Sequence, residues 1–390
     1  MSTKSIKLEN SALRAISLAA ILVCLVGVYF TAKWAFANTI ALKAEKQTDA
    51  DPIVISEFAV GLAPSDPQTH YTLAALYDKS FLLENQPKSL AEYEAAAALA
   101  PNDFRLWLAL GKARERNGDV EGAEDAVRRA VKLAPNYSLV QWTLGNILLR
   151  QNKTNEAFAE IRKATENDTT YANPAIAAAW QTFNGDLTQI KQNLGDAPQT
   201  KTALASFLLK QKKYRGAMQI LSELNGAENF AVGKISNSGF ESKEKPEETK
   251  DFEWQIADGA KPEIGIATLQ KHNGNNSLGF VFNSADGKDF RNVSQLVAIE
   301  SGKKYIFETF YKADLKTSAT LRWEIVNEAD GKILATTDAV SANSDWTSLK
   351  TEFIAPETSE AVIIRLVRDQ CKTTACSISG KIWFDDFSLN

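Results

Sequence analysis

The chain has 390 residues, of which 44% are hydrophobic and 24% charged, and its formal net charge is -4. This composition excludes a mainly disordered chain, and the negative charge argues against a protein that binds nucleic acid through a basic face. Only two histidines are present, His70 and His272, which excludes a histidine-rich metal centre and disfavours a histidine-based catalytic triad. The length allows two or three domains.

The first long segment is an uncharged apolar run from Ala15 to Ala32, 18 residues in length. As a helix, this run can cross most of the hydrocarbon core of a bilayer. Trp34 and Phe36 follow it, where an interfacial aromatic belt is expected. We predict an uncleaved, single-pass anchor in an inner (cytoplasmic) membrane. The alternatives are a cleaved signal peptide, because residues 35–37 fit a small-x-small cleavage site, and a buried core helix.

A four-residue pattern, Leu-Ala-Pro-Asn, occupies residues 99–102 and recurs 34 residues later at residues 133–136. A period of 34 residues is that of the tetratricopeptide repeat, which is a pair of antiparallel helices. One helix pair cannot bury its own apolar face, so a series of copies predicts a stacked α-solenoid, here over residues 45–226. Partial copies lie at residues 67–103, 138–171, 172–197 and 198–226.

Residues 104–137 resemble the tetratricopeptide motif almost throughout. Trp107, Leu110 and Gly111 have the W-x2-L-G spacing of its first helix, and Ala123 occupies the small position of its second helix. We expect Gly111 and Ala123 to let the two helices approach closely. The resemblance implies a protein or peptide ligand in the groove of the array. The alternative is that the array is a rigid spacer.

After Ala227 the alanine-rich helical pattern gives way to short alternating runs, separated by turns such as Asn273-Gly274 and Asp330-Gly331. About eight short strands in such a segment predict a β-sandwich or jelly roll. The clearest predicted strands are residues 279–282, 295–299, 305–311, 320–326, 349–354, 361–367 and 381–389.

Several landmarks in this segment resemble carbohydrate-binding modules of families 4 and 9, which have a galactose-binding-like jelly roll. They run from Gly239-Phe240-Glu241 through Trp254 to a closing Trp-Phe-Asp-Asp-Phe stretch at residues 383–387. The resemblance implies a calcium ion held by Glu241 and Asp385, because hard carboxylate oxygens suit calcium. The alternative is that both carboxylates face solvent or cap turns.

The resemblance also implies a carbohydrate ligand. Sugar rings pack their C–H faces on aromatic rings, while planar polar side chains bond to their hydroxyls. The predicted carbohydrate-binding residues are Trp254, Gln295, Tyr311, Arg322 and Trp323, with Asn283 and Trp346 as further candidates. Core packing is the alternative for every ring, and the aromatic residues assigned to the core are Phe280, Phe282, Phe307, Phe353, Trp383 and Phe384.

Cys371 and Cys376 lie close together in a polar stretch, and they predict a small disulfide if this domain faces an oxidising compartment. The alternative is a pair of free thiols. Cys24 lies in the apolar run and is expected to act as a small buried hydrophobe. Basic residues flank that run on both sides and give no orientation. The candidate disulfide and the sugar-type module favour a periplasmic or extracellular location for the later domains.

The sequence contains no Walker loop, no G-x-S-x-G, no H-E-x-x-H and no C-x-x-C motif. We expect a multidomain α plus β protein, with a tail and anchor at residues 1–44, helical repeats at 45–226 and a jelly roll at 227–390. The predicted function is a non-catalytic, membrane-anchored scaffold that binds a protein partner and a glycan in envelope polysaccharide or exopolysaccharide assembly. The alternatives are a glycan-active accessory protein or hydrolase, and an adaptor that binds only proteins.

Overall fold

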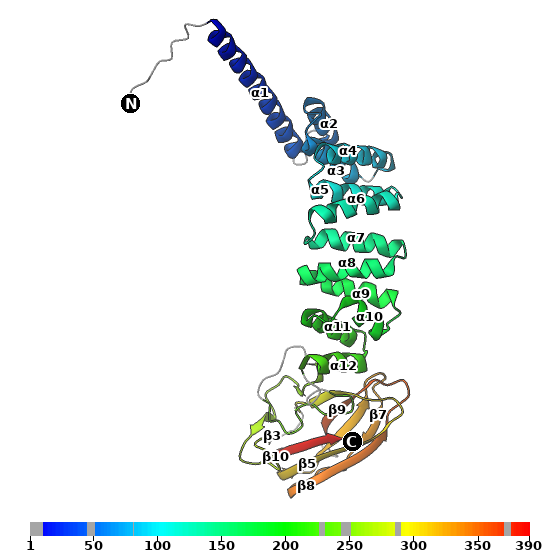
Figure 1. The fold of residues 1–390 in the computed structure, drawn as a ribbon. Helices are drawn as coiled ribbons and strands as arrows, with labels where there is room; N and C mark the ends of the chain where they lie inside the picture. Colours follow the sequence, from blue (N-terminus) through cyan, green and yellow to red (C-terminus); the bar gives the residue numbers. More distant parts are fainter. Residues whose placement is uncertain are drawn as a thin grey trace, which may run out of the picture. The chain divides into compact units, whose positions relative to one another are not determined.

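The structure is a computed structural model, and it describes residues 11–44, 51–80, 82–225, 231–242, 251–284, 290–369 and 376–390. Figure 1 shows the helices and strands in chain order. The chain divides into two compact units, Met1–Tyr171 and Ala172–Asn390. Among the described residues the first unit is helical, and the second combines helices with a β-sandwich.

Helix α1 (Ser11–Ala44) confirms the predicted N-terminal apolar helix. It is the single helix in the described part of the chain that is long and apolar enough to cross a membrane. The helix continues beyond the uncharged run, and its last turns carry three buried alanines, Ala37, Ala41 and Ala44. This end of α1 packs against α2 (Pro52–Leu62) and α3 (Pro67–Lys79), so it belongs to the folded unit.

Helix pairs make up the rest of the first unit and confirm the predicted helical repeats. Aspartates begin several of these helices: the carboxylate of Asp103 accepts a hydrogen bond from the backbone N–H of Arg105. Such a cap satisfies an N–H group that the first turn of a helix leaves without a partner. The pairs are α3 with α4 (Gln86–Leu99), α5 (Phe104–Arg116) with α6 (Val120–Leu133), and α7 (Ser138–Arg150) with α8 (Thr154–Asn167); η1 (Leu83–Asn85) and η2 (Thr169–Tyr171) are short 3-10 turns.

The contact between α5 and α6 depends on a glycine, as the sequence predicts. A Cβ atom at Gly111 would lie 3.2 Å from the carbonyl oxygen of Ala123, and closer still to the side chain of Val127. A larger residue would therefore push the two helices apart. Val127 is fully buried and shares a core cluster with Leu144 of α7, so the packed pair also stacks on the next one.

The second unit begins with four helices, and their end meets the sandwich. The turn before α12 and the first residue of that helix lie against segments that connect strands. Lys212 Nζ is 2.9 Å from Glu328 Oε1, and the rings of Tyr214 and Phe252 meet edge to face with centroids 6.5 Å apart. Burial and the Glu328 carboxylate raise the pKa of Tyr214, which keeps its hydroxyl protonated. The helices are α9 (Ala172–Thr182), α10 (Leu187–Leu194), α11 (Pro198–Lys210) and α12 (Tyr214–Asn225).

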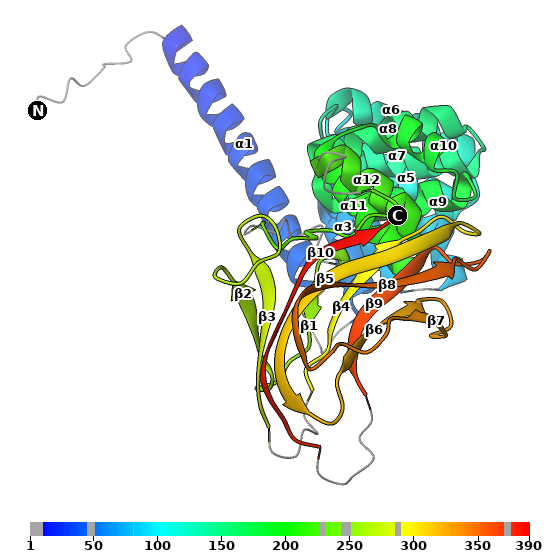
Figure 2. The same ribbon diagram turned by 90° about the horizontal axis from the view of Figure 1, so that it is seen from below.

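The strands of the second unit form two antiparallel sheets, as predicted for a sandwich. Sheet A has the order β1-β4-β9-β6-β7, and sheet B has the order β2-β3-β10-β5-β8. Figure 2 shows the strands of sheet B side by side. The strands are β1 (Gln255–Ile256), β2 (Glu263–Ala267), β3 (Ser277–Ser284), β4 (Val293–Ala298), β5 (Lys304–Thr317), β6 (Leu321–Asn327), β7 (Ile333–Thr336), β8 (Asn343–Ile354), β9 (Ala361–Arg368) and β10 (Ile378–Leu389).

The three strands that the sequence does not predict, β1, β2 and β7, lie at sheet edges and have two to five residues each. Runs of this length carry too little periodicity to be detected. The predicted strands are all present, and β5 alternates buried and solvent-facing residues along most of its length. Its buried residues join an aromatic core between the sheets, in which Trp323 lies 5.3 Å from Phe384 and 5.0 Å from Phe387, measured between ring centroids.

Candidate functional site

Three of the four aromatic rings that the sequence predicts to stack on a sugar lie in this core. Trp323, Tyr311 and Trp254 are 0%, 3% and 6% exposed. A ring whose faces are covered by protein offers no face to a sugar, so the core-packing alternative corrects the prediction for these residues. The physical reason is strand alternation, which points Tyr311 and Trp323 toward the interior of the sandwich. Trp254 also borders an apolar recess of about 500 Å³ at the edge of the sandwich.

The predicted polar partners divide between the interior and the surface. Gln295 is buried, and its Nε2 donates a hydrogen bond to the backbone carbonyl of Ser236 at 2.9 Å. Arg322 precedes the buried Trp323 and therefore points to the outer face of sheet A. There its Nε donates to Asp369 at 2.6 Å, and the Asp369 carboxylate raises the pKa of Arg322. Arg322 is thus separated from Gln295 and from the three rings.

The predicted calcium ligands, Glu241 and Asp385, both accept hydrogen bonds from one turn, residues 272–276. Glu241 Oε1 accepts from the backbone N–H groups of residues 275 and 276, at 2.6 and 2.9 Å. Asp385 Oδ2 accepts from those of residues 272 and 273, at 2.9 and 3.2 Å, although burial raises the pKa of the Asp385 carboxyl. These N–H groups face the oxygens that a calcium ion would need.

No three His, Cys, Asp or Glu side chains of the described residues come together in a way that could hold a metal ion. The predicted site has two carboxylates completed by backbone carbonyls and is not of this kind, so calcium binding by Glu241 and Asp385 stays a prediction. The two carboxylates tie the turn to β10 and to the segment that precedes β1.

Of the predicted disulfide pair, Cys371 lies outside the described residues, so its bond with Cys376 stays a prediction. Cys24 is a free thiol, and it is exposed on α1 rather than buried. In a membrane-spanning helix this exposed surface is the one that lipid covers.

One aromatic side chain that the sequence analysis assigned to the core, Trp383, instead lies on the outer face of sheet B. It stands between Ile382 and Phe384, which are fully buried, and successive residues of a strand point to opposite faces. The alternation along β10 is the signal that places Trp383 on the opposite face from Ile382 and Phe384, although it does not tell which face is buried. The indole ring covers Gly279 of β3, where a Cβ atom would lie 3.1 Å from Cδ1 of Trp383.

Glycines leave room for a groove beside Trp383. Trp383 of β10, Gly279 of β3 and Gly265 of β2 pair with one another across the three strands. The two positions beside Trp383 in this cross-strand row therefore have no side chain. The groove has a volume of about 650 Å³. A flat ligand in this groove can lie against the indole ring, and the polar side chains of the groove can form hydrogen bonds with that ligand. The other lining side chains include Glu263, Ile266, Gln270, Val281 and Lys381.

A second aromatic group contains Trp346. The His272 ring stacks on Phe310 with centroids 4.0 Å apart, and it lies 5.6 Å from the Trp346 ring. Asp386 holds His272 in place, with 2.5 Å between Oδ2 and Nδ1. Trp346 and Phe310 are half-buried, so these rings form a supported cluster. The remaining polar candidate, Asn283, is exposed on β3.

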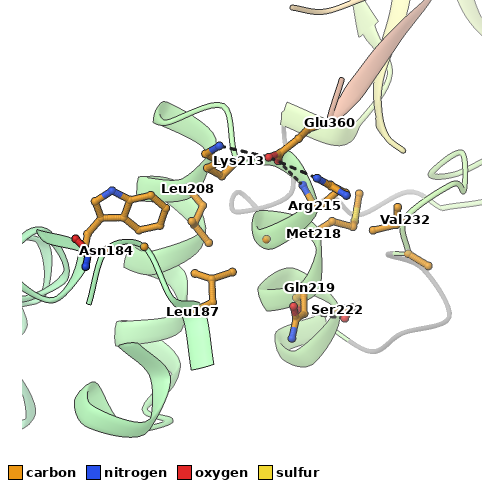
Figure 3. A pocket seen from close by; sticks show the side chains of 14 residues that line it. Asn184, Leu187, Leu208, Lys213, Arg215, Met218, Gln219, Ser222, Val232 and Glu360 are labelled. Carbon is orange, nitrogen blue, oxygen red and sulfur yellow. Dashed lines mark hydrogen bonds and ion pairs between the residues drawn. The ribbon is translucent and has the colours of Figure 1, made fainter. Parts of the chain in front are cut away.

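A further recess lies between the helices of the second unit and the sandwich, and Figure 3 shows it from close by. Its volume is about 780 Å³. Leu187, Leu208 and Met218 give it an apolar lining, and amide and hydroxyl groups lie at its border. Such a recess can hold a bulky apolar side chain of a peptide and bond to the adjoining backbone. The polar lining residues include Asn184, Gln219 and Ser222.

Glu360 lies at the rim of this recess and faces two basic side chains (Figure 3). Its Oε1 is 3.5 Å from Lys213 Nζ and 3.9 Å from Arg215 Nη2. The backbone N–H of Arg215 also donates to its Oε2 at 3.4 Å. Because Glu360 directly precedes β9, these contacts tie α12 to the sandwich. Two cations against one carboxylate leave net positive charge at the rim, which favours an acidic ligand.

Comparison with protein-family models matches residues 104–147 to the tetratricopeptide repeat. A search of curated proteins finds no match to the chain. The solved structure described as "Crystal structure of MamA" is 14% identical, with 42% of this chain and 90% of that chain covered and a TM-score of 0.35.

Two further solved structures are similar to parts of the chain. "Functional Characterization of Pseudomonas Aeruginosa pilF" is 16% identical, covering 50% of this chain and 93% of that chain, with a TM-score of 0.36. "CBM4 structure and function" is 18% identical, covering 40% of this chain and 98% of that chain, with a TM-score of 0.29. By its helix pairs and its family-model match, the chain contains tetratricopeptide repeats, followed by an antiparallel two-sheet β-domain.

Proposed function

We propose that the protein is a membrane-anchored, non-catalytic scaffold that binds a protein partner through its helical repeats and a glycan through its β-sandwich. The apolar helix α1 is the proposed anchor, and the domains after it are proposed to lie in the periplasm or outside the cell. The proposed setting is the assembly of an envelope polysaccharide or exopolysaccharide.

The observation that carries the glycan part is the groove beside Trp383. A half-buried indole on an open sheet face is the type of surface on which the C–H face of a sugar packs. The glycines on the neighbouring strands keep that surface clear. Lys381, Gln270 and Glu263 supply donors and acceptors for the sugar hydroxyls. This groove replaces the buried rings as the proposed binding surface.

The recess of Figure 3 supports the protein-binding part. Its apolar lining suits one bulky aliphatic or aromatic side chain, and Lys213 and Arg215 suit an acidic residue beside it. We therefore propose that the partner presents a short segment with these two features. Gln219→Glu places a carboxylate at the exposed border of the recess, where it repels an acidic segment, and it should weaken capture of that partner from solubilised envelope proteins while leaving the fold intact.

Glycan-array binding of the full-length protein in detergent tests the glycan proposal. Trp383→Ala should lower binding about tenfold or more, because it removes the stacking surface. The matched control is Trp346→Ala, which removes a half-buried tryptophan outside the groove and should leave binding unchanged. EDTA should have no effect, because Glu241 and Asp385 already bond to backbone N–H groups. Equal binding by the wild type and Trp383→Ala would contradict the proposal, and release of free sugar would favour the enzyme alternative.

A further inference from the structure

Helix α2 carries an apolar face that the helical repeats do not cover. Its Ser56 and Ala59 are buried, whereas Val54 and Phe58 are 60% and 59% exposed. These two side chains are four residues apart, so they are neighbours on one face of the helix. Two large apolar side chains side by side at such exposure mark a contact surface.

The position of α2 identifies what covers this face. The end of α1 packs against α2 and α3 through its buried alanines, and Asn38 Nδ2 of α1 donates a hydrogen bond of 2.5 Å to Asp66, the residue that caps α3. Figure 1 shows α2 beside the C-terminal end of α1. The apolar face is therefore attached directly to the proposed membrane-spanning helix.

The distance along α1 gives the level of α2 relative to the bilayer. The uncharged run ends at Ala32, and the first buried alanine is Ala37, five positions later. At a rise of 1.5 Å per residue this separation is about 7.5 Å. Each headgroup layer of a bilayer is about 5–8 Å thick, from the difference between total and hydrocarbon thickness. The buried alanines continue to Ala44, about 18 Å from the same point, so when α1 spans the hydrocarbon core its contact with α2 begins at the level of the headgroups.

We propose that α2 lies in the membrane interface, with Val54 and Phe58 inserted into the headgroup–acyl boundary of the bilayer that α1 spans. The proposal rests on the proposed anchoring by α1. Insertion of an apolar helix face to this depth is typical of interfacial helices. The one charged residue within α2, Glu57, has a partner in the protein, because its Oε1 accepts a hydrogen bond of 2.6 Å from the Tyr77 hydroxyl. Lipid contact at α2 would hold the first helix pair against the membrane surface.

Depth-dependent fluorescence quenching of the full-length protein in phosphatidylcholine nanodiscs tests this proposal. A polarity-sensitive dye is attached at Phe58→Cys, and separately at Val54→Cys, in a background in which Cys24, Cys371 and Cys376 are alanine. Quencher-bearing lipids carry the quencher either near the headgroup or near the chain end. Both labels should lose about half of their fluorescence or more to the headgroup quencher, and less to the chain-end quencher.

Two control positions separate this proposal from the one on which it rests. A label at Val23→Cys, in the middle of α1, should be quenched by the chain-end lipid, and a label at Glu121→Cys, on the exposed surface of α6, by neither. Quenching at Val23 without quenching at Val54 and Phe58 would overturn the interfacial helix and leave the anchor standing. No quenching at Val23 would overturn both. Protection of both α2 labels from the headgroup quencher in nanodiscs that hold two copies, and also in those that hold one, would overturn lipid contact, and protection with two copies alone would assign the face to self-association.

Discussion

Replacing Trp323 decides whether the central tryptophan of the sandwich is a core residue. Its side chain is fully buried and lies within 6.2 Å of four other aromatic rings, measured between centroids. Replacement of such a side chain by alanine costs about 3–5 kcal/mol, because it removes buried apolar area and leaves a cavity. We expect Trp323→Ala to reach the upper part of this range, since each lost aromatic pair adds about 0.5–1.5 kcal/mol.

Trp323→Phe is the matched control. None of the residues that the structure describes accepts a hydrogen bond from the indole N–H of Trp323, and burial of such an unpaired donor costs about 1–3 kcal/mol. Phenylalanine removes this donor and retains most of the apolar contact. The free energy gained by removing the unpaired donor offsets the cost of the cavity, which is smaller than in Trp323→Ala. We therefore expect the free energy of unfolding to change by less than about 1.5 kcal/mol.

Hydrogen exchange followed by mass spectrometry measures the stability of both variants, through the exchange rates of backbone amides in peptides from β6 and β9. A loss of 3–5 kcal/mol accelerates exchange of core amides by about two to nearly four orders of magnitude, whereas Trp323→Phe should change it about tenfold or less. Glycan binding by Trp323→Phe should equal that of the wild type. Unchanged exchange in Trp323→Ala together with lost glycan binding would refute the assignment of Trp323 to the core.

Two further predictions concern the helical repeats. His70 Nδ1 lies 2.5 Å from Glu92 Oε2, and this hydrogen bond raises the pKa of His70 above its usual 6.5. The stabilisation from this bond is fully present below about pH 6.5 and is lost as the pH rises through the raised pKa of His70. The thermal midpoint of the wild type should therefore exceed that of His70→Gln at about pH 6, and the two midpoints should converge at alkaline pH. A difference in midpoint that stays constant with pH would contradict the charge argument. Gly111→Val should cost about 1–3 kcal/mol, measured by chemical denaturation, because its added side chain overlaps Val127. Gly61→Ala is the control, since a Cβ atom there meets none of the described residues within 4 Å and the change should be neutral or stabilising.

The helical repeats could be predicted from sequence in detail because their packing is local. Gly111 and Val127 face each other within one helix pair, so a fixed spacing in the sequence is enough to place them. The face of a strand is harder to assign. Ile382, Trp383 and Phe384 are all apolar, so alternation indicates that Trp383 differs from its neighbours but not which of the two faces is buried.

The candidate sites could not be predicted for a different reason. The groove beside Trp383 exists because glycines from two other strands lie next to it, and the sequence does not give the register of those strands. The recess of Figure 3 combines residues from Asn184 to Glu360, which only the folded unit brings together. Likewise, the sequence predicts Glu241 and Asp385 as calcium ligands, and it does not show that both accept hydrogen bonds from backbone N–H groups of a distant turn.

The strand order of sheet B has a consequence for the speed of folding. Ile378 of β10 pairs with Ser284 of β3, 94 positions earlier, whereas the helices of each repeat pair with their immediate neighbours. Pairing over such separations requires the closure of long loops, so sheets of this kind form in milliseconds to seconds and helical arrays in microseconds to milliseconds. The repeats should therefore be complete while the aromatic side chains of the future sandwich are still in water. That interval is when the chain is most prone to aggregate and most dependent on a chaperone.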